Sequence, residues 1–208
     1  MANTIQEYVA EREIKCLLHF TRQSNLESIL QRGLVTRNTL VLEGHNNFND
    51  QYRLDGTDAV CLSIGFPNYK MFFGLRQANQ GEDWVVLAIH PAALWTLPCA
   101  FCTTNAASAS VTAIPLEQRR DLAALQLMYE DWGEKTRAML GIQNQYPTNP
   151  QAEVLMLNGV PREYIFGVIV LNQAKQQELK AKYPNLDVRA LAGYFRYRSD
   201  YAHWKQGV

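Results

Sequence analysis

Two short motifs carry polar side chains whose types and spacing could do chemistry. His19 and Thr21 flank Phe20 at the end of an apolar run, and residues two apart in an extended chain point to the same face. Gln151 and Glu153 have the same spacing at the start of another apolar run. An imidazole, a hydroxyl and a carboxylate that apolar neighbours partly desolvate are groups that bind polar ligands and stabilise developing charge.

Each of these residues also has a purely structural interpretation. His19 could be a core histidine hydrogen-bonded to the backbone, and Glu153 could be an edge-strand carboxylate that discourages pairing between sheets. Arg53 lies in a polar, turn-rich stretch from residue 43 to 58, where an arginine could simply be solvated. Loops of this length in a compact domain are, however, usually functional or mobile. The residues alone leave these alternatives open.

The cysteines and histidines do not indicate a metal site. Cys99 and Cys102 form a CxxC pair inside an apolar stretch, which is typical of either buried thiols or a redox pair. A structural zinc normally needs four ligands, and the sequence has neither a second CxxC nor an HxxxH pair, so we expect no metal. The fingerprints of Rossmann, P-loop and α/β-hydrolase proteins are also absent from the sequence.

The composition limits the class of protein. The chain has 208 residues, of which 47% are apolar, enough for one domain with a sizeable core over residues 1–208. Twenty Lys and Arg balance twenty Asp and Glu, so a global electrostatic attraction to DNA, RNA or anionic lipid is excluded. The sequence has no run of about 20 apolar residues and no secretory signal at its start, and its four cysteines are scattered. We therefore expect a soluble, cytoplasmic protein without membrane contact.

The elements that must position the two motifs are strands and helices in irregular alternation, which favours the α+β class. A capping box formed by Ser24 and Glu27 predicts a helix that ends at Gly33. Apolar runs and turn residues predict strands over residues 14–20, 60–66, 84–90, 152–157 and 165–171, with a weaker one over 194–198. Helical periodicity predicts helices from residue 69 onward, across 116–140 and over 174–182.

Taken in order, these segments resemble the DarT family, the DNA ADP-ribosyltransferase toxins of DarT–DarG toxin–antitoxin systems. The resemblance spans about residues 14 to 171. Its most specific parts are the stretches 18–21 with 25–34, then 61–72, and finally 151–155 with 160–165. It implies an ADP-ribosyltransferase-like mixed or antiparallel central sheet with flanking helices. The implied reaction splits NAD+, transfers ADP-ribose to a base in single-stranded DNA and releases nicotinamide.

The resemblance also implies roles for individual residues. Glu153 would bind the ribose 2′-hydroxyl and act in catalysis, with Arg53 contacting the dinucleotide or the acceptor, and Gln151 would face the acceptor. The remaining implied contacts to NAD are His19 and Thr21 on the nicotinamide side, Gly33 and Leu34 on the adenosine side, and Phe66 or Tyr69 stacking near nicotinamide. A macrodomain antitoxin like DarG would be the partner. Family members modify thymine or guanine, and the sequence does not choose between them.

The sequence leaves alternatives open for the C-terminal segment and for the function. From residue 189 to 208 the chain combines four basic residues with five aromatic ones, a composition that suits single-stranded nucleic acid. The same pattern also fits an amphipathic strand with its aromatic side chains inside. An ADP-ribosyltransferase of RNA or protein, and a non-catalytic module that binds NAD or nucleic acid, are the other functions compatible with the sequence.

Overall fold

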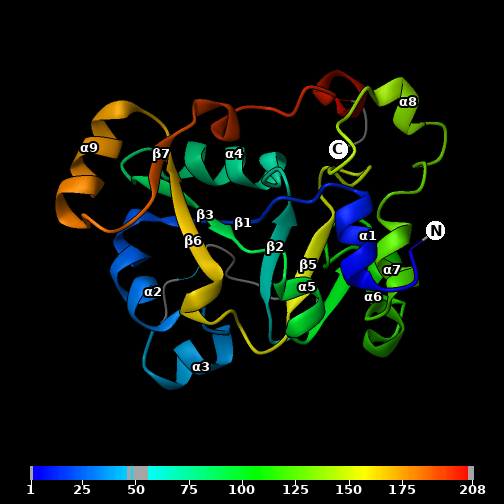
Figure 1. Cartoon of the computed structure of the whole chain (residues 1–208), viewed down its shortest axis with the longest axis horizontal. Coiled ribbons are helices and arrows are strands. Elements are labelled where there is room, and N and C mark those ends of the chain that lie inside the picture. Colours follow the sequence, from blue (N-terminus) through cyan, green and yellow to red (C-terminus); the bar gives the residue numbers. More distant parts are fainter. Residues whose placement is uncertain (1, 46–47, 49–55, 206–208) are drawn as a thin grey trace.

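The computed structural model describes residues 2–45, 48 and 56–205. At its centre is a seven-stranded sheet with the order β4-β5-β2-β1-β3-β6-β7 (Figure 1). Neighbouring strands are antiparallel, except that β6 and β7 run parallel. The expected α+β class with a mixed, largely antiparallel sheet is confirmed. The strands are β1 (Leu17–Arg22), β2 (Val60–Ile64), β3 (Trp84–Ile89), β4 (Cys99–Cys102), β5 (Glu153–Met156), β6 (Ile165–Val170) and β7 (Val188–Ala190).

Nine α-helices surround this sheet in the described part of the chain, and most have only one or two turns. None of them is long and apolar enough to cross a membrane. The two longest, α4 and α9, are capped at their N-termini by Asn68 and Asn172, whose side chains accept hydrogen bonds from backbone N–H groups three residues on. The helices are α1 (Ile5–Glu11), α2 (Leu26–Arg32), α3 (Arg37–Leu42), α4 (Tyr69–Ala78), α5 (Ala93–Thr96), α6 (Ala109–Thr112), α7 (Leu122–Leu127), α8 (Arg137–Leu140) and α9 (Gln173–Lys182).

The two faces of the sheet are covered differently. One face packs against a single large apolar core, to which α1, α2, α5, α7 and α9 contribute. The other face carries two smaller clusters: α4 packs over β1, β3 and β6, and α6 packs over β4 and β5. Between these two clusters lies β2, where Cys61 is exposed although it sits in the middle of the sheet. The sheet is therefore thinly covered where β2 separates β1 from β5.

β1 belongs mainly to one side of the sheet. All six of its residues pair with β3, whereas only Leu17 and Leu18 pair with β2, opposite Ile64 and Ser63. β2 in turn pairs with β5, where Leu62 lies opposite Val154. After Leu18 the two central strands therefore diverge, and the backbone of this part of β2 has a strand partner only in β5.

Several predicted elements are confirmed with small shifts in their ends. The continuous apolar run at Trp84–Ile89 is a fully buried strand with neighbours on both sides, as near-continuous apolar runs predict. The strand predicted over 14–20 spans Leu17–Arg22, so Thr21 lies inside the strand and not at its end. The helices predicted from residue 69 and over 174–182 are α4 and α9.

Other predictions were wrong. A turn of 3₁₀ helix at Gln23–Asn25 precedes α2, and Asn25 caps α2 without a side-chain hydrogen bond, so Ser24 and Glu27 do not form a capping box. The strand expected over 194–198 does not form, because Ala192–Phe195 is a 3₁₀ turn. The helical pattern over 116–140 is divided into short pieces, and the N-terminal helix α1 and strand β4 were not predicted.

The end of α2 is fixed by a close backbone contact. Gly33 has φ +82° and ψ −169°, a conformation almost exclusive to glycine, and Leu34 exchanges two 2.8 Å backbone hydrogen bonds with Val160. A Cβ on Gly33 would lie within 2.2 Å of the Val160 carbonyl oxygen and 2.9 Å of the Arg162 nitrogen. The predicted stop at Gly33 is confirmed, and this glycine ties α2 to the segment that follows β5.

We predict that Gly33→Ala lowers the free energy of unfolding by about 3 kcal/mol, from backbone strain plus a clash with fixed backbone atoms. The matched control is Gly44→Ala, since Gly44 also has positive φ (+84°) but a Cβ there meets nothing within 4 Å. That variant should lose only about 1 kcal/mol. Urea unfolding of both variants measures the difference. Equal losses in the free energy of unfolding would show that the contact with Val160 does not contribute to stability.

Candidate functional site

His19 lies in β1 just after the strand leaves β2. Its Nδ1 lies 3.0 Å from the Cys61 carbonyl oxygen of β2, so the ring donates from Nδ1 and Nε2 is the acceptor nitrogen. Burial lowers the pKa of His19, and the hydrogen bond to Cys61 only partly opposes that shift. The imidazole is therefore neutral, with a fixed tautomer. Through Nδ1, His19 is the backbone-bonded histidine of the structural interpretation. Its Nε2 is left available to a ligand.

Thr21 shares the side of β1 on which His19 lies, because both pair with β3 at alternate positions. Its side chain is buried, and its hydroxyl oxygen accepts a 3.0 Å hydrogen bond from Asn25 Nδ2. Asn25 thereby fixes the hydroxyl and ties the 3₁₀ turn to β1.

Glu153 is the first residue of β5 and is only 6% exposed. Its Oε2 accepts a 2.8 Å hydrogen bond from the backbone N–H of Ala106, and the residue opposite it in β4 is Cys102. β5 has β4 on one side and β2 on the other, so Glu153 does not lie on an edge strand. The interpretation of this carboxylate as an edge-strand device is wrong. A buried carboxylate oriented by a backbone donor is the kind of group used in catalysis.

The structure brings the two predicted motifs to opposite sides of β2. The His19 ring contacts the carbonyl of Cys61, while β5 pairs with Cys61 and Leu62 directly after Glu153. One strand separates β1 from β5, so their backbones lie roughly 10 Å apart, two strand spacings, where β1 still pairs with β2 at Leu17 and Leu18, and farther apart beyond. In a flat sheet, the regular alternation of side chains would put His19 and Glu153 on different faces. Because β1 diverges from β2 before His19, the alternation of side chains along β1 does not determine how His19 lies relative to β5.

A hollow of about 550 Å³ continues from the far end of β5. Leu34, one of the predicted adenosine-side residues, and Leu157 line it, and Leu157 packs with the same small cluster as Leu155. Gly33 shapes this region through its contact with Val160. The full lining is Arg32, Leu34, Val35, Thr36, Thr39, Asp58, Leu157, Asn158, Val160 and Pro161.

Phe66 and Tyr69 belong to an aromatic cluster at the other end of β2. Phe66 is half-buried and stacks on Tyr194 with ring centroids 5.7 Å apart, and its edge faces Tyr146. Tyr69 is buried beneath Tyr197 and Tyr201, and its hydroxyl has no hydrogen-bond partner among the described residues. The two predicted stacking residues thus differ in exposure, since Phe66 lies closer to the surface than Tyr69.

The structure gives less information about the two remaining candidate residues, Gln151 and Arg53. Gln151 lies in a turn before β5, where its N–H donates to Asn149 Oδ1 over 2.9 Å, so the strand alternation used to group it with Glu153 does not apply. Arg53 lies outside the described residues.

The CxxC pair is not a redox pair. Cys99 and Cys102 are three residues apart in β4 and pack into different apolar clusters on opposite faces of the sheet. Both thiols are buried, and burial raises the pKa of Cys99 to about 11. Within the described residues no group of His, Cys, Asp and Glu side chains is arranged to hold a metal.

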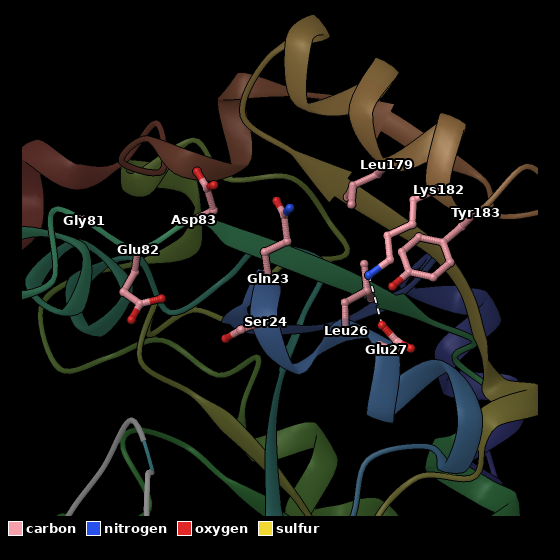
Figure 2. A pocket seen from close by; sticks show the side chains of 10 residues that line it. All are labelled: Gln23, Ser24, Leu26, Glu27, Gly81, Glu82, Asp83, Leu179, Lys182 and Tyr183. Carbon is pink, nitrogen blue, oxygen red and sulfur yellow. Dashed lines mark hydrogen bonds and ion pairs between the residues drawn. The ribbon is translucent and has the colours of Figure 1, made fainter.

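A second hollow, of about 340 Å³, lies between the start of α2, the turn before β3 and the end of α9 (Figure 2). An ion pair of 2.9 Å between Lys182 and Glu27 crosses it. None of the predicted site residues that the structure describes lines this hollow, and its charged side chains form ion pairs, so it is not part of the candidate site.

Sequence reasoning missed three contributors to the site. The backbone N–H of Ala106 and the carbonyl of Cys61 hold the two key side chains, and backbone groups leave no signal in residue types. Arg119 is the third: it is only 7% exposed and its Nη1 donates to Cys102 Sγ, beside Glu153. Nothing in the sequence distinguishes it from the next residue, Arg120, which is exposed and pairs with an acidic side chain one turn earlier.

Comparisons with known proteins place this geometry in context. A family model described as "ssDNA thymidine ADP-ribosyltransferase, DarT" matches residues 18–195. No curated protein matches the chain in sequence. Thermosipho africanus DarTG in complex with ADP-ribose has a TM-score of 0.58 and 17% identity, over 87% of this chain and 51% of that one. This chain thus spans about half of its length.

Two structures of Thermus sp. 2.9 DarT match over nearly their whole length. The complex with NAD+ has a TM-score of 0.53 and 15% identity, over 88% of this chain and 98% of that one. The complex with ADP-ribosylated ssDNA has a TM-score of 0.51 and 16% identity, over 88% and 97%. At these identities the likeness shows a shared fold.

The imidazole of His19 generates a prediction for pH. Because the pKa of His19 is lower in the folded chain than in the unfolded one, the unfolded state binds its proton more tightly. Stability due to neutral His19 is therefore fully present above the ordinary histidine pKa of about 6.5 and is lost as pH falls below it.

His19→Asn, which keeps a side-chain donor for Cys61, should make the free energy of unfolding less dependent on pH between about 7 and 5. His90→Asn, which replaces an exposed imidazole, is the control. Urea unfolding at a series of pH values measures both slopes. If the His19 variant and the wild type have parallel curves, the fold does not hold His19 in its neutral form.

Proposed function

The chain belongs to the DarT family of ssDNA thymidine ADP-ribosyltransferases, and from this premise we propose how its own residues carry out the transfer. The acceptor is thymidine in single-stranded DNA, the donor is NAD+, and nicotinamide is released. The observation that carries the proposal is Glu153, a buried carboxylate held by a backbone N–H beside the strand that separates it from His19.

The reaction itself explains why a buried carboxylate is needed. The bond between nicotinamide and the ribose C1′ breaks, and positive charge develops on the ribose before the base of the acceptor forms its bond to C1′. A carboxylate close to the ribose stabilises this charge, and in a site with little water the interaction is stronger than in solution. The Ala106 N–H fixes Oε2, so the carboxylate does not have to reorganise during the reaction. Glu153 binds the ribose 2′-hydroxyl in this proposal and takes the proton that the attacking base loses.

His19 and Thr21 hold the nicotinamide side of the dinucleotide. Because Nδ1 of His19 donates to the Cys61 carbonyl, Nε2 is the ring's acceptor and receives a hydrogen bond from a ribose hydroxyl or the carboxamide. Thr21 supports this position from the same side of β1. Phe66, the more exposed of the two predicted aromatic residues, supplies the stacking surface.

The adenosine half occupies the hollow that Leu34 lines, beyond the far end of β5. Glu153 begins this four-residue strand and Leu157 directly follows it, and in this proposal one extended ligand spans the carboxylate and the hollow. Arg53 contacts the dinucleotide or the acceptor, and Gln151 faces the acceptor base. The complex of Thermus sp. 2.9 DarT with NAD+ supports NAD+ as the donor, because that protein shares the fold.

In the cell we propose that the protein is the toxin of a toxin–antitoxin pair and acts in the cytoplasm, where NAD+ and single-stranded DNA are present. A macrodomain antitoxin like DarG would remove the modification. The structure of Thermosipho africanus DarTG in complex with ADP-ribose supports such a partner, since a DarTG protein with the same fold over part of its chain binds the group that is transferred.

The transfer is tested with short single-stranded oligonucleotides that differ at one base, incubated with the enzyme and NAD+. Mass spectrometry should show the mass of one ADP-ribose added only where thymine is present. Glu153→Gln, which keeps an acceptor for the Ala106 N–H, should lower the transfer rate about 10²–10³-fold without loss of stability. The control is Glu163→Gln, because Glu163 is exposed.

Two results would contradict the proposal. Transfer by Glu153→Gln at the wild-type rate would remove Glu153 from catalysis. The enzyme can also be incubated with labelled NAD+ and separate pools of single-stranded DNA, RNA and protein. Modification of RNA or protein in preference to DNA would show that the acceptor is not single-stranded DNA.

The role of Gln151 makes a second prediction. If Gln151 faces the acceptor, Gln151→Ala should lower the rate of DNA modification about tenfold while leaving the Kd for NAD+ unchanged, since only acceptor contacts are removed. Calorimetric titration with NAD+ and the transfer assay together measure the split. A loss of NAD+ affinity would instead place Gln151 on the dinucleotide.

A further inference from the structure

The loop that leads into Glu153 is held by the C-terminal segment of the chain. Arg198 donates to two consecutive backbone carbonyls of this loop, from Nη1 to Pro147 over 2.8 Å and from Nη2 to Thr148 over 2.7 Å. Five residues later the same loop becomes β5 with Glu153 at its start. An interaction across about fifty residues of sequence therefore ends close to the proposed catalytic carboxylate.

Arg198 is oriented by partners of its own. It is 3% exposed and makes a two-point ion pair with Asp200, from Nε to Oδ1 over 2.7 Å and from Nη2 to Oδ2 over 2.6 Å. Asp200 is 1% exposed and also accepts a 2.7 Å hydrogen bond from Trp204 Nε1. A buried ion pair is costly unless its geometry and remaining hydrogen bonds are satisfied, and these are.

A second arginine holds the same loop. Arg137, from α8, donates from Nη1 to the Tyr146 carbonyl over 2.8 Å and to the Thr148 hydroxyl over 3.1 Å. The Tyr146 ring packs against the edge of Phe66. The loop is thus fixed through its carbonyls by two guanidinium groups and through a ring by the aromatic cluster.

We propose that Arg198, Asp200 and Trp204 form an anchor whose task is to set the shape of residues 145–151, the wall that faces the acceptor DNA. These three are positioning residues, because they act through the loop and not on the substrate. The inference rests on the proposed function in one respect: it takes the acceptor to be single-stranded DNA that meets the loop at Gln151.

This role for Arg198 differs from the contact with single-stranded nucleic acid that the basic and aromatic residues over 189–208 suggest. Most donors of Arg198 are used inside the protein, and Phe195 and Trp204 are buried at 5% and 7% exposure. Arg196, two residues earlier, is exposed. If the segment attracted DNA by charge, replacing Arg196 would raise KM for DNA more than replacing Arg198. If Arg198 is an anchor, replacing Arg198 has the larger effect on KM.

The test compares Arg198→Lys, which keeps the charge but loses the two-point fork, with Arg196→Met. For Arg198→Lys we expect about a tenfold rise in KM for a thymine-containing oligonucleotide, since misplacing a positioning loop by about 1 Å can cost up to 10²-fold. The Kd for NAD+ should stay close to wild type, whereas the melting temperature should fall, because the buried Asp200 loses its two-point partner. Arg196→Met should leave KM unchanged at all salt concentrations.

Two further measurements separate the anchor from a general effect on folding. Trp204→Phe removes the hydrogen bond to Asp200 together with part of a buried ring, keeps the Arg198–Asp200 ion pair, and should raise KM in the same direction by a smaller factor. Hydrogen exchange should speed up over residues 145–151 in both anchor variants, with no change in the strands. This readout does not depend on activity, so it tests the anchor even if the acceptor is not DNA.

The outcomes are distinct. A wild-type enzyme that does not modify DNA contradicts the proposed function, while faster exchange over 145–151 in Arg198→Lys still supports the anchor. A salt-dependent rise in KM for Arg196→Met, with Arg198→Lys unchanged, overturns the anchor in favour of charge attraction. Equal losses of NAD+ affinity, DNA affinity and melting temperature in Arg198→Lys and Trp204→Phe overturn it in favour of a purely structural role.

Discussion

The arrangement of the whole site depends on one hydrogen bond that replaces strand pairing. β1 stops pairing with β2 after Leu18. Beyond that point the imidazole of His19 donates to the Cys61 carbonyl, so a side chain and not the backbone of β1 links the two central strands. The same bond fixes the tautomer of the ring. One side chain therefore links the two strands and has a defined tautomer at the candidate site.

The separation of the strands also explains why a carboxylate can be buried nearby. The face of the sheet opposite the main core is divided into two small clusters, with exposed Cys61 between them. Glu153 lies at the border of the second cluster, where the turn after β4 supplies the N–H of Ala106. A charged group is tolerated in such a place only with hydrogen bonds of this kind. Burial, orientation and access to a ligand thus follow from the same division of the sheet.

Residue patterns predicted the parts of the fold that depend on local apolar periodicity. Trp84–Ile89, α4 and α9 are such parts, and Gly33 was recognisable as a helix end. The order of motifs in the family resemblance gave the sheet type. What could not be predicted depends on tertiary partners: the Ser24–Glu27 spacing fits a capping box, yet the chain forms a 3₁₀ turn there, from which Asn25 bonds to Thr21. Ala106 and Cys61 contribute backbone groups, which have no signature in sequence.

Arg198 illustrates the same limit in terms of charge. Counting residues assigns it to a basic, aromatic C-terminal segment, but in the fold its charge is paired with Asp200 and its donors hold the loop before β5. Arg119 is likewise buried, against Cys102. Two of the twenty Lys and Arg side chains are thus buried, so neither of them can neutralise a phosphate at the surface and release a counterion. In the proposed function, Arg198 therefore contributes to the site of the single-stranded acceptor through the loop before Glu153 and not through surface charge.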